Sequence, residues 1–182
     1  MTRLTVPDTR LQQSLADTVA DFGDVAAMHG SGYWHLGEGP LDTSEAGVAA
    51  MVETLRGYAD VGRELDEPWV HCDYLWITDG EPEEVVGFLA IRHTLNEFLL
   101  DQGGHVGYSI RPSRRGQGHA TRALALALDR AAELGIERVL VTCDDDNEPS
   151  RRTIVRNGGV LEDVRGRKER YWIDPAARQT GR

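Results

Sequence analysis

One stretch of this chain constrains its fold more than any other: a strand pattern, a glycine-containing turn and a long helix pattern follow each other directly. The strand pattern GHVGYSIRP ends at Pro112, and glycines follow at positions 116 and 118. Alanine and leucine then recur at helical spacing as far as Gly135. The apolar run from Glu137 to Cys143 predicts another strand. A strand, a helix and a strand in this order form a crossover unit, so we expect the two strands to be parallel.

Strand and helix signals on both sides extend this unit into one domain. Further strands are expected at residues 4–6, 74–78, 85–93, 160–164 and 168–173, and further helices at 8–22, 43–62 and about 147–157. The order of these elements predicts an α/β fold, a mixed sheet with helices on both faces. The length of 182 residues fits a single domain, 1–182, with a helical N-terminal part at about 1–65 and a loose tail at about 175–182.

Composition narrows the class of function. The chain has 20 Lys and Arg against 30 Asp and Glu, a formal net charge of −10, and its basic residues cluster only in pairs. Because such a protein repels phosphate backbones, nucleic-acid binding is not expected, whereas a cationic acceptor suits the charge. Cys72 and Cys143 stand far apart, which leaves no disulfide framework and no paired-cysteine site, and no metal is predicted. No apolar run has the length of a signal peptide or a membrane span, so a cytoplasmic protein without membrane partners is expected.

The turn sequence RPSRRGQGHAT, residues 111–121, carries the most chemistry. Its two glycines let the backbone turn sharply and leave successive amide N–H groups exposed at a helix start. Such amides bind phosphate oxygens with help from the helix dipole, so a pyrophosphate is the expected ligand. A P-loop would need Lys and then Ser or Thr where His119 and Ala120 stand, and a dinucleotide fingerprint would need glycine at Ser113. The alternative stays open that the glycines only make a tight turn.

Two motifs together resemble the GNAT superfamily of acyl-coenzyme A-dependent N-acyltransferases. The stretch RGQGHA matches the superfamily pattern Q/R-x-x-G-x-G/A through Arg115, Gly118 and Ala120. The stretch NEPSRRTIVRNGG resembles its second segment through Asn147, Ser150 and Gly158. The stretches IRHTLN, GHVGYSIRPS, CDDDN and NGG are further similar to a bacterial group of predicted acetyltransferases. The resemblance covers residues 74–172, roughly the second half of the chain and more.

The resemblance implies a mostly antiparallel sheet with a central pair of parallel, splayed strands, and acetyl-CoA as the cofactor. Backbone groups of Ser109 and Ile110 would hold the pantetheine arm where the parallel strands part. Asn147 and Ser150 would contact the far side of the arm, unless the asparagine is only a helix cap and the serine an ordinary first-turn hydroxyl. The pyrophosphate would lie in a cradle of seven consecutive residues: Arg115, Gly116, Gln117, Gly118, His119, Ala120 and Thr121.

Acyl transfer from a thioester to an amine needs a proton acceptor for the amine and a proton donor for the thiolate. His105 is the predicted acceptor, because it starts the strand that leads into the turn; the alternative is that it only fixes the adjacent glycine loop. The superfamily often has its donor tyrosine at the position of Ile154, and an isoleucine cannot donate a proton. Tyr108 is the predicted replacement and Tyr171 a second one, although packing in the core is the alternative for both.

The predicted function is therefore a cytoplasmic N-acetyltransferase. It would move an acetyl group from acetyl-CoA to an amine of a small or cationic acceptor in a direct ternary complex. The N-terminal part is expected to bind the acceptor, with aromatic residues 33–35 near it, and Glu97 and Asp101 are substitute proton acceptors. Two other classes stay open: a module that senses acyl-CoA without turnover, and a nucleotide-binding protein. A homodimer also stays open.

Overall fold

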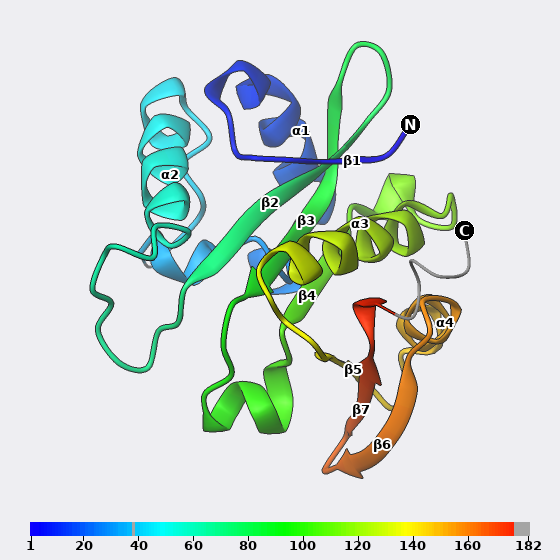
Figure 1. Cartoon of the computed structure of the whole chain (residues 1–182). Coiled ribbons are helices and arrows are strands. Elements are labelled where there is room, and N and C mark those ends of the chain that lie inside the picture. The colour runs from blue at the N-terminus through cyan, green and yellow to red at the C-terminus, as the bar shows by residue number, and fades with distance from the viewer. Residues whose placement is uncertain (38, 177–182) are drawn as a thin grey trace.

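Seven strands form one sheet in the part of the chain that the computed structural model describes, residues 1–37 and 39–176 (Figure 1). The strand order is β1-β2-β3-β4-β5-β7-β6, and of the neighbouring pairs only β4 and β5 run parallel. The strands are β1 Arg3–Thr5, β2 Cys72–Asp79, β3 Glu84–Arg92, β4 Val106–Ile110, β5 Val139–Asp144, β6 Val160–Arg165 and β7 Lys168–Ile173.

Helices connect the strands. The described α-helices are α1 Gln12–Phe22, α2 Glu45–Gly57, α3 His119–Glu133 and α4 Glu148–Arg156. Shorter turns of 3-10 helix lie at Thr9–Leu11, Val25–Ala27, Tyr33–His35 and Pro112–Arg114, and a π-helical turn lies at Leu99–Gly103. The start of α2 is fixed by Ser44, whose Oγ accepts a hydrogen bond from the Gly47 N–H at 3.1 Å.

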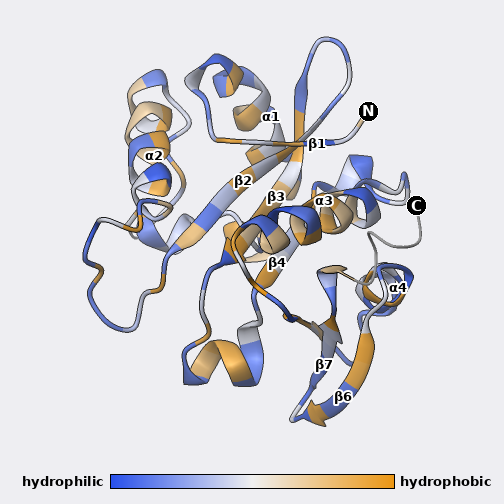
Figure 2. Cartoon of the chain, viewed as in Figure 1, coloured by the Kyte–Doolittle hydropathy of each residue, from blue (hydrophilic) through white to orange (hydrophobic). Residues whose placement is uncertain are grey.

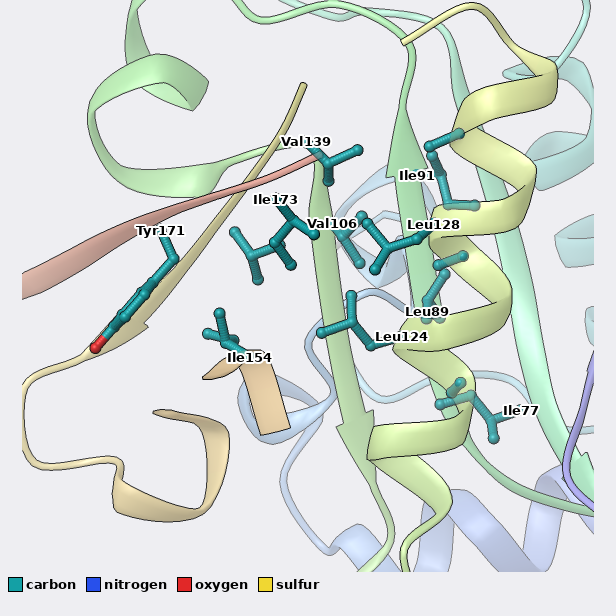
Figure 3. Close-up of a cluster of buried hydrophobic side chains, with 14 of the residues drawn as sticks. Ile77, Leu89, Ile91, Val106, Leu124, Leu128, Val139, Ile154, Tyr171 and Ile173 are labelled. Carbon is teal, nitrogen blue, oxygen red and sulfur yellow. The ribbon is translucent and has the colours of Figure 1, made fainter. Parts of the chain in front are cut away.

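The helices cover both faces of the sheet, because a central strand sends alternate side chains to opposite sides. On β3, Phe88 and Ala90 pack in the cluster of α1 and α2, whereas Leu89 packs with α3. Figure 3 shows Leu89 beside Leu124, within the same cluster as Ile154 of α4. The predicted α/β sheet with helices on both faces is confirmed.

The two parallel strands part soon after they meet. One residue pair, Val106 with Val141, joins β4 to β5. By contrast, β4 pairs with β3 from Val106 to Ile110, and β5 pairs with β7 along the whole strand. Beyond Val106 the facing backbone groups of β4 and β5 therefore have a gap between them. This confirms the predicted central pair of parallel, splayed strands.

Two elements are shorter than their sequence patterns predicted. The strand expected over GHVGYSIRP begins only at Val106, because Gly104 has a φ of 67° and turns the chain before the strand. The helix expected over residues 43–62 ends at Gly57, since the Asp60 side chain accepts the Gly62 N–H at 2.9 Å and favours a turn. Most of the predicted tail, 175–182, lies outside the described residues.

The π-helical turn Leu99–Gly103 is an element that the sequence analysis did not identify as regular structure. It lies between β3 and β4, and Figure 2 shows that apolar residues form much of it. Leu99 is buried, whereas Phe98 is 67% exposed. Its apolar residues are too few for a helical repeat, which is why the pattern did not predict it.

Candidate active site

The turn between β4 and α3 presents unpaired amides at the surface. Gly116 and Gly118 have φ values of 74° and 82°, a left-handed conformation that favours glycine, and α3 begins directly after them. Within the described chain, no hydrogen-bond acceptor pairs with the amide N–H groups of residues 116–121. A Cβ added at Gly116 would meet no atom within 4 Å. The predicted cradle is therefore open and carries free donors.

Two arginines add positive charge to this turn. Arg115 Nε donates to the last carbonyl of β4 at 3.0 Å, and Arg122 Nη2 donates to Gln117 O at 2.8 Å. Neither guanidinium forms an ion pair with a carboxylate in the part of the chain described, whereas the adjacent Arg114 pairs with Glu84 at 2.7 Å. Free amides and unpaired guanidinium groups at a helix start suit a diphosphate.

The backbone N–H and C=O groups of Ser109 and of Ile110 face opposite sides of β4. A Cβ added at Gly87 of β3 would lie 2.1 Å from Ser109 O, so this carbonyl faces β3. Alternate residues direct their backbone groups to opposite sides of a strand, so those of Tyr108 and Ile110 face the gap. The expectation for Ser109 is corrected accordingly: its peptide groups belong to the β3 pairing, and its hydroxyl donates to His29 O at 2.8 Å.

A cavity of about 640 Å³ opens beside the gap. Its walls include residues 106–108 of β4 and residues 142–144 of β5. The cradle residues 115–121 are not among those that line it, because they follow the C-terminal end of β4. A ligand held at the turn would therefore reach the cavity along the gap. The volume suits a small molecule.

Three predicted residues meet at the wall of the cavity. Asn147 Oδ1 accepts the Ser150 N–H at 3.2 Å, so the asparagine caps α4 as well as lining the cavity. Ser150 Oγ lies 2.8 Å from the Tyr108 hydroxyl, which joins α4 to β4 across the gap. Burial raises the pKa of Tyr108 to about 12, so its phenol keeps its proton near neutral pH. Ile154, by contrast, is fully buried in the core (Figure 3).

His105 lies beside the cavity and is buried. Its Nδ1 accepts the Leu140 N–H at 2.9 Å, and its own backbone N–H donates to Leu140 O at 2.7 Å. Burial, reinforced by the positive charge of Arg92, lowers the pKa of His105 to about 4. The imidazole is therefore neutral, and the one ring nitrogen that could accept a proton is already bonded to β5. This geometry favours the alternative in which His105 fixes the adjacent glycine loop.

His29 is a group whose place in the site the sequence analysis missed. Its side chain lines the cavity, and no hydrogen bond within the described chain engages its ring. Burial, followed by the charge of Lys168, lowers the pKa of His29 from its ordinary value of 6.5. The nearby Asp144 carboxylate is held by Lys168 Nζ at 2.6 Å. His29 is thus a neutral imidazole whose ring nitrogens are free. The sequence does not show that it reaches the cavity, because this depends on how its loop folds against β4.

The remaining candidates do not supply a reactive group. Glu97 and Asp101 are absent from the cavity wall, and Asp101 pairs with Arg165 at 3.2 Å. Tyr171 donates to Glu169 Oε2 at 2.8 Å within the core. Cys143 lines the cavity, but burial and the adjacent Glu169 raise its pKa to about 12, so it stays a thiol.

Aromatic side chains gather at the cavity from separate segments of the chain. Besides Tyr108, those in the wall are Trp34, Trp69, Tyr74 and Phe98. His35 lies behind them, stacked on Tyr58 with ring centroids 3.9 Å apart, and its Nε2 accepts the Trp34 indole N–H at 3.0 Å. Burial, with Arg92 as the second cause, lowers the pKa of His35 to about 4. The aromatic loop thus borders the cavity and is also anchored to the core.

Among the described residues, no group of three or more His, Cys, Asp or Glu side chains is arranged to hold a metal ion. None of their helices combines the length and the apolar character that crossing a membrane requires.

The chain is similar to known acetyltransferases in sequence and in fold. A model of the acetyltransferase (GNAT) domain matches residues 12–160, whereas no curated protein matches the sequence. RimJ of Mycobacterium smegmatis, solved in complex with CoA-disulfide, is 21% identical with a TM-score of 0.66, over 100% of this chain and 94% of that one. The ribosomal-protein-S5-alanine acetyltransferase of Vibrio fischeri is 16% identical with a TM-score of 0.66, over 96% and 92%. The microcin C7 self immunity acetyltransferase MccE, solved with acetyl-CoA and AMP, is 15% identical with a TM-score of 0.63, over 95% and 92%.

The family match includes both parallel strands, the turn between them and α4, which are the elements that form the gap. It confirms the resemblance drawn from the two sequence motifs. The chain belongs to the GNAT family of acetyltransferases.

Proposed function

We propose that this protein transfers an acetyl group from acetyl-CoA to an amine that enters the cavity beside β4 and β5. One observation carries the proposal: free amides at the 116–121 turn lie at one end of a gap whose other end is the cavity. Bound acetyl-CoA would supply the acetyl group as a thioester, which only an unprotonated amine attacks.

The cofactor-binding residues have distinct roles in this proposal. The amides of residues 116–121, with Arg115 and Arg122, hold the diphosphate. The backbone groups of Tyr108 and Ile110 hold the pantetheine arm as a neighbouring strand would. The side chains of Asn147 and Ser150 bound the far side of the gap. The N-terminal part, residues 1–65, contributes the acceptor side through Trp34 and its loop.

Two side chains handle protons. His29 accepts the proton of the amine, because it is a neutral imidazole in the cavity wall with no hydrogen bond to its ring. Tyr108 donates the proton that the departing sulfur needs, since its phenol is protonated and faces Ser150 in the same cavity. His105 keeps the two parallel strands in register rather than acting on the amine.

The acceptor is an amine of a small molecule or of a protein. Several of the similar structures are named as acetyltransferases of ribosomal proteins, which supports a protein amine as an alternative to a free one. The cavity volume of about 640 Å³ supports a small amine or the end of a chain.

Release of the coenzyme A thiol from acetyl-CoA, measured with and without a panel of small amines and N-terminal peptides, tests the proposal. Amine-dependent release that yields an acetylated product is expected. Tight coenzyme binding with only slow hydrolysis would instead identify an acyl-CoA sensor. Thermal stabilisation by ATP or NAD, and none by coenzyme A, would identify a nucleotide-binding protein.

A further inference from the structure

The cavity contains a positive charge that no carboxylate balances. Arg92, the last residue of β3, lines the cavity and forms no ion pair within the described chain. Its Nη1 donates to the carbonyls of Gly103 and Gly104 at 3.3 and 3.2 Å. Its Nε and Nη2 donate to no residue that the structure describes. Half of the guanidinium fork is thus anchored and the other half is free to bind a ligand.

The guanidinium lies in van der Waals contact range of β4, one of the two parallel strands. A Cβ added at Gly107 of β4 would lie 3.5 Å from Arg92 Nη1 and 3.6 Å from Nη2. Gly107 also lines the cavity, directly before Tyr108. The free side of Arg92 therefore lies close to the place where the amine and the thioester would meet.

The charges around the cavity favour an anion over a second cation. Among the described residues, its wall contains one carboxylate, Asp144, and Lys168 already neutralises it at 2.6 Å. The field of Arg92 reaches the neighbouring imidazoles, where after burial it is the second cause that lowers the pKa of His35 and of His105. The wall therefore carries a net positive charge, although the whole chain carries −10.

The rest of the wall is apolar and aromatic. Trp34 and Trp69 come from separate loops, and Tyr74 and Phe98 complete the set. Trp69 is 44% exposed and Phe98 67% exposed, so both present accessible apolar surface at the cavity. Aromatic walls bind flat or apolar bodies by stacking and by removing them from water.

We infer that the acceptor is a small amine with an aromatic or apolar body and an anionic group, a carboxylate or a phosphate, which Arg92 binds. The inference rests on the proposed acetyl transfer and names the substrate class of that same site. It replaces the cationic acceptor that net charge alone predicted, because the charge of the cavity, not of the surface, acts on the bound molecule.

Matched pairs of amines test this inference. Phenylalanine against 2-phenylethylamine and tryptophan against tryptamine differ by one carboxylate, and 4-(aminomethyl)phenylphosphonate against benzylamine differs by a phosphonate. The kcat/KM of the anionic member is expected to exceed that of its partner on the order of 10- to 100-fold in at least one pair. The pair in which the ratio is largest tells a carboxylate from a phosphate acceptor.

Two variants show whether Arg92 is responsible. In Arg92→Gln the ratio should fall to about 1, while coenzyme A affinity and the melting temperature show that the fold is intact. Arg165→Gln is the matched control, because Arg165 does not line the cavity and pairs with Asp101 and Asp163, so this variant should keep the ratio. Equal rates within every pair, or a ratio that survives in Arg92→Gln, would overturn the inference.

A binding measurement without turnover separates this inference from the proposed function. Calorimetric titration with 3-phenylpropionate, which has no amine, should show binding to the wild-type chain and none to Arg92→Gln. Absence of binding to the wild type, together with normal coenzyme A binding, would refute the acceptor class alone. Absence of coenzyme A binding and of thiol release with every amine would refute acetyl transfer.

Discussion

Of three histidines in this part of the molecule, His29 lines the cavity, whereas His35 and His105 lie next to residues that line it. His35 accepts the Trp34 indole N–H, and His105 accepts the Leu140 N–H. The ring of His29 has no such partner in the described chain and lies in the cavity wall. The pKa of all three is lowered from the ordinary histidine value, so accessibility of a lone pair, rather than charge, decides which one can accept a proton.

Replacement of His29 and of His105 should have different consequences. His29→Gln is expected to lower kcat/KM about 10²-fold. Because the pKa of His29 is lowered, protonation inactivates the wild type only below the ordinary histidine pKa of about 6.5. This gives the plot of kcat/KM against pH an acidic limb, which His29→Gln should lose. His105→Gln should keep the limb and lower the melting temperature. The pH dependence of kcat/KM for both variants checks this; loss of the limb only in His105→Gln would contradict the assignment.

Tyr108 is expected to matter for turnover more than for binding. Tyr108→Phe keeps the ring and removes the hydroxyl that faces Ser150, so kcat should fall about 10²-fold while coenzyme A affinity changes little. Steady-state kinetics with a coenzyme A titration measure both. Tyr171→Phe is the matched control, because its hydroxyl bonds Glu169 in the core. An unchanged kcat in Tyr108→Phe would mean that the thiolate takes its proton from elsewhere.

At the scale of elements, the strand-turn-helix unit was predictable because its signals are local. Strand pattern, Pro112, two glycines and a helical repeat all lie within one short stretch. The direction of the Ser109 backbone was not predictable, since it depends on which residues of β3 and β4 pair. His29 and Trp69 were missed for the same reason: each reaches the cavity through contacts distant in sequence, and neither stands in a motif.

The turn can be tested with two glycines in the same backbone conformation. Gly116 has a φ of 74° and Gly135 a φ of 76°, and a Cβ added at either meets no atom within 4 Å. Alanine at either site should cost a similar strain of about 1–2 kcal/mol. Coenzyme A affinity should fall only in Gly116→Ala, because that Cβ enters the space beside the free amides. Calorimetric titration of both variants measures this, and equal affinities would argue against the cradle.

The edge of the sheet contains an acid-sensitive group of hydrogen bonds around Glu83. Glu83, in the turn between β2 and β3, accepts hydrogen bonds from Thr78 at 2.7 Å and from Thr5 of β1 at 3.1 Å, and Arg10 lies 2.6 Å away. The hydrogen bond from Thr78 is the largest cause that lowers the pKa of Glu83, and the bond from Arg10 lowers it further. Together they outweigh burial, which raises it, and bring the pKa to about 2. A lowered pKa means that this stabilisation is complete above the ordinary pKa of about 4.5 and is lost as pH falls toward 2.

Glu83→Gln should therefore unfold at lower denaturant concentration than the wild type at pH 7. The difference should shrink as pH falls from about 4.5 toward 2, because the wild-type carboxyl then becomes neutral too. Denaturant unfolding across this range measures the difference. Glu97→Gln is the control, because Glu97 is exposed and the structure shows no such hydrogen bonds for it. A constant difference at all pH values would contradict the role of the charge.

At the scale of the whole molecule, the two core clusters support different parts of the site. The cluster of α3 and α4 supports the turn and the gap, whereas the cluster of α1 and α2 supports the loops that bring His29 and Trp34 to the cavity. The sheet lies between them and holds both halves in one place (Figure 1). The overall layering followed from the order of sequence patterns, but the meeting of the two halves at one cavity depends on tertiary packing alone.

The central claim is that the amides of residues 116–121 bind a diphosphate while the attached arm lies in the gap between β4 and β5. Calorimetric titration of the full chain with coenzyme A and with pantetheine, which lacks the diphosphate, tests it most directly. Coenzyme A should bind at least about 10-fold more tightly, and added salt should weaken its binding more than that of pantetheine. Equal affinities for the two compounds, or heat from neither, would contradict the claim.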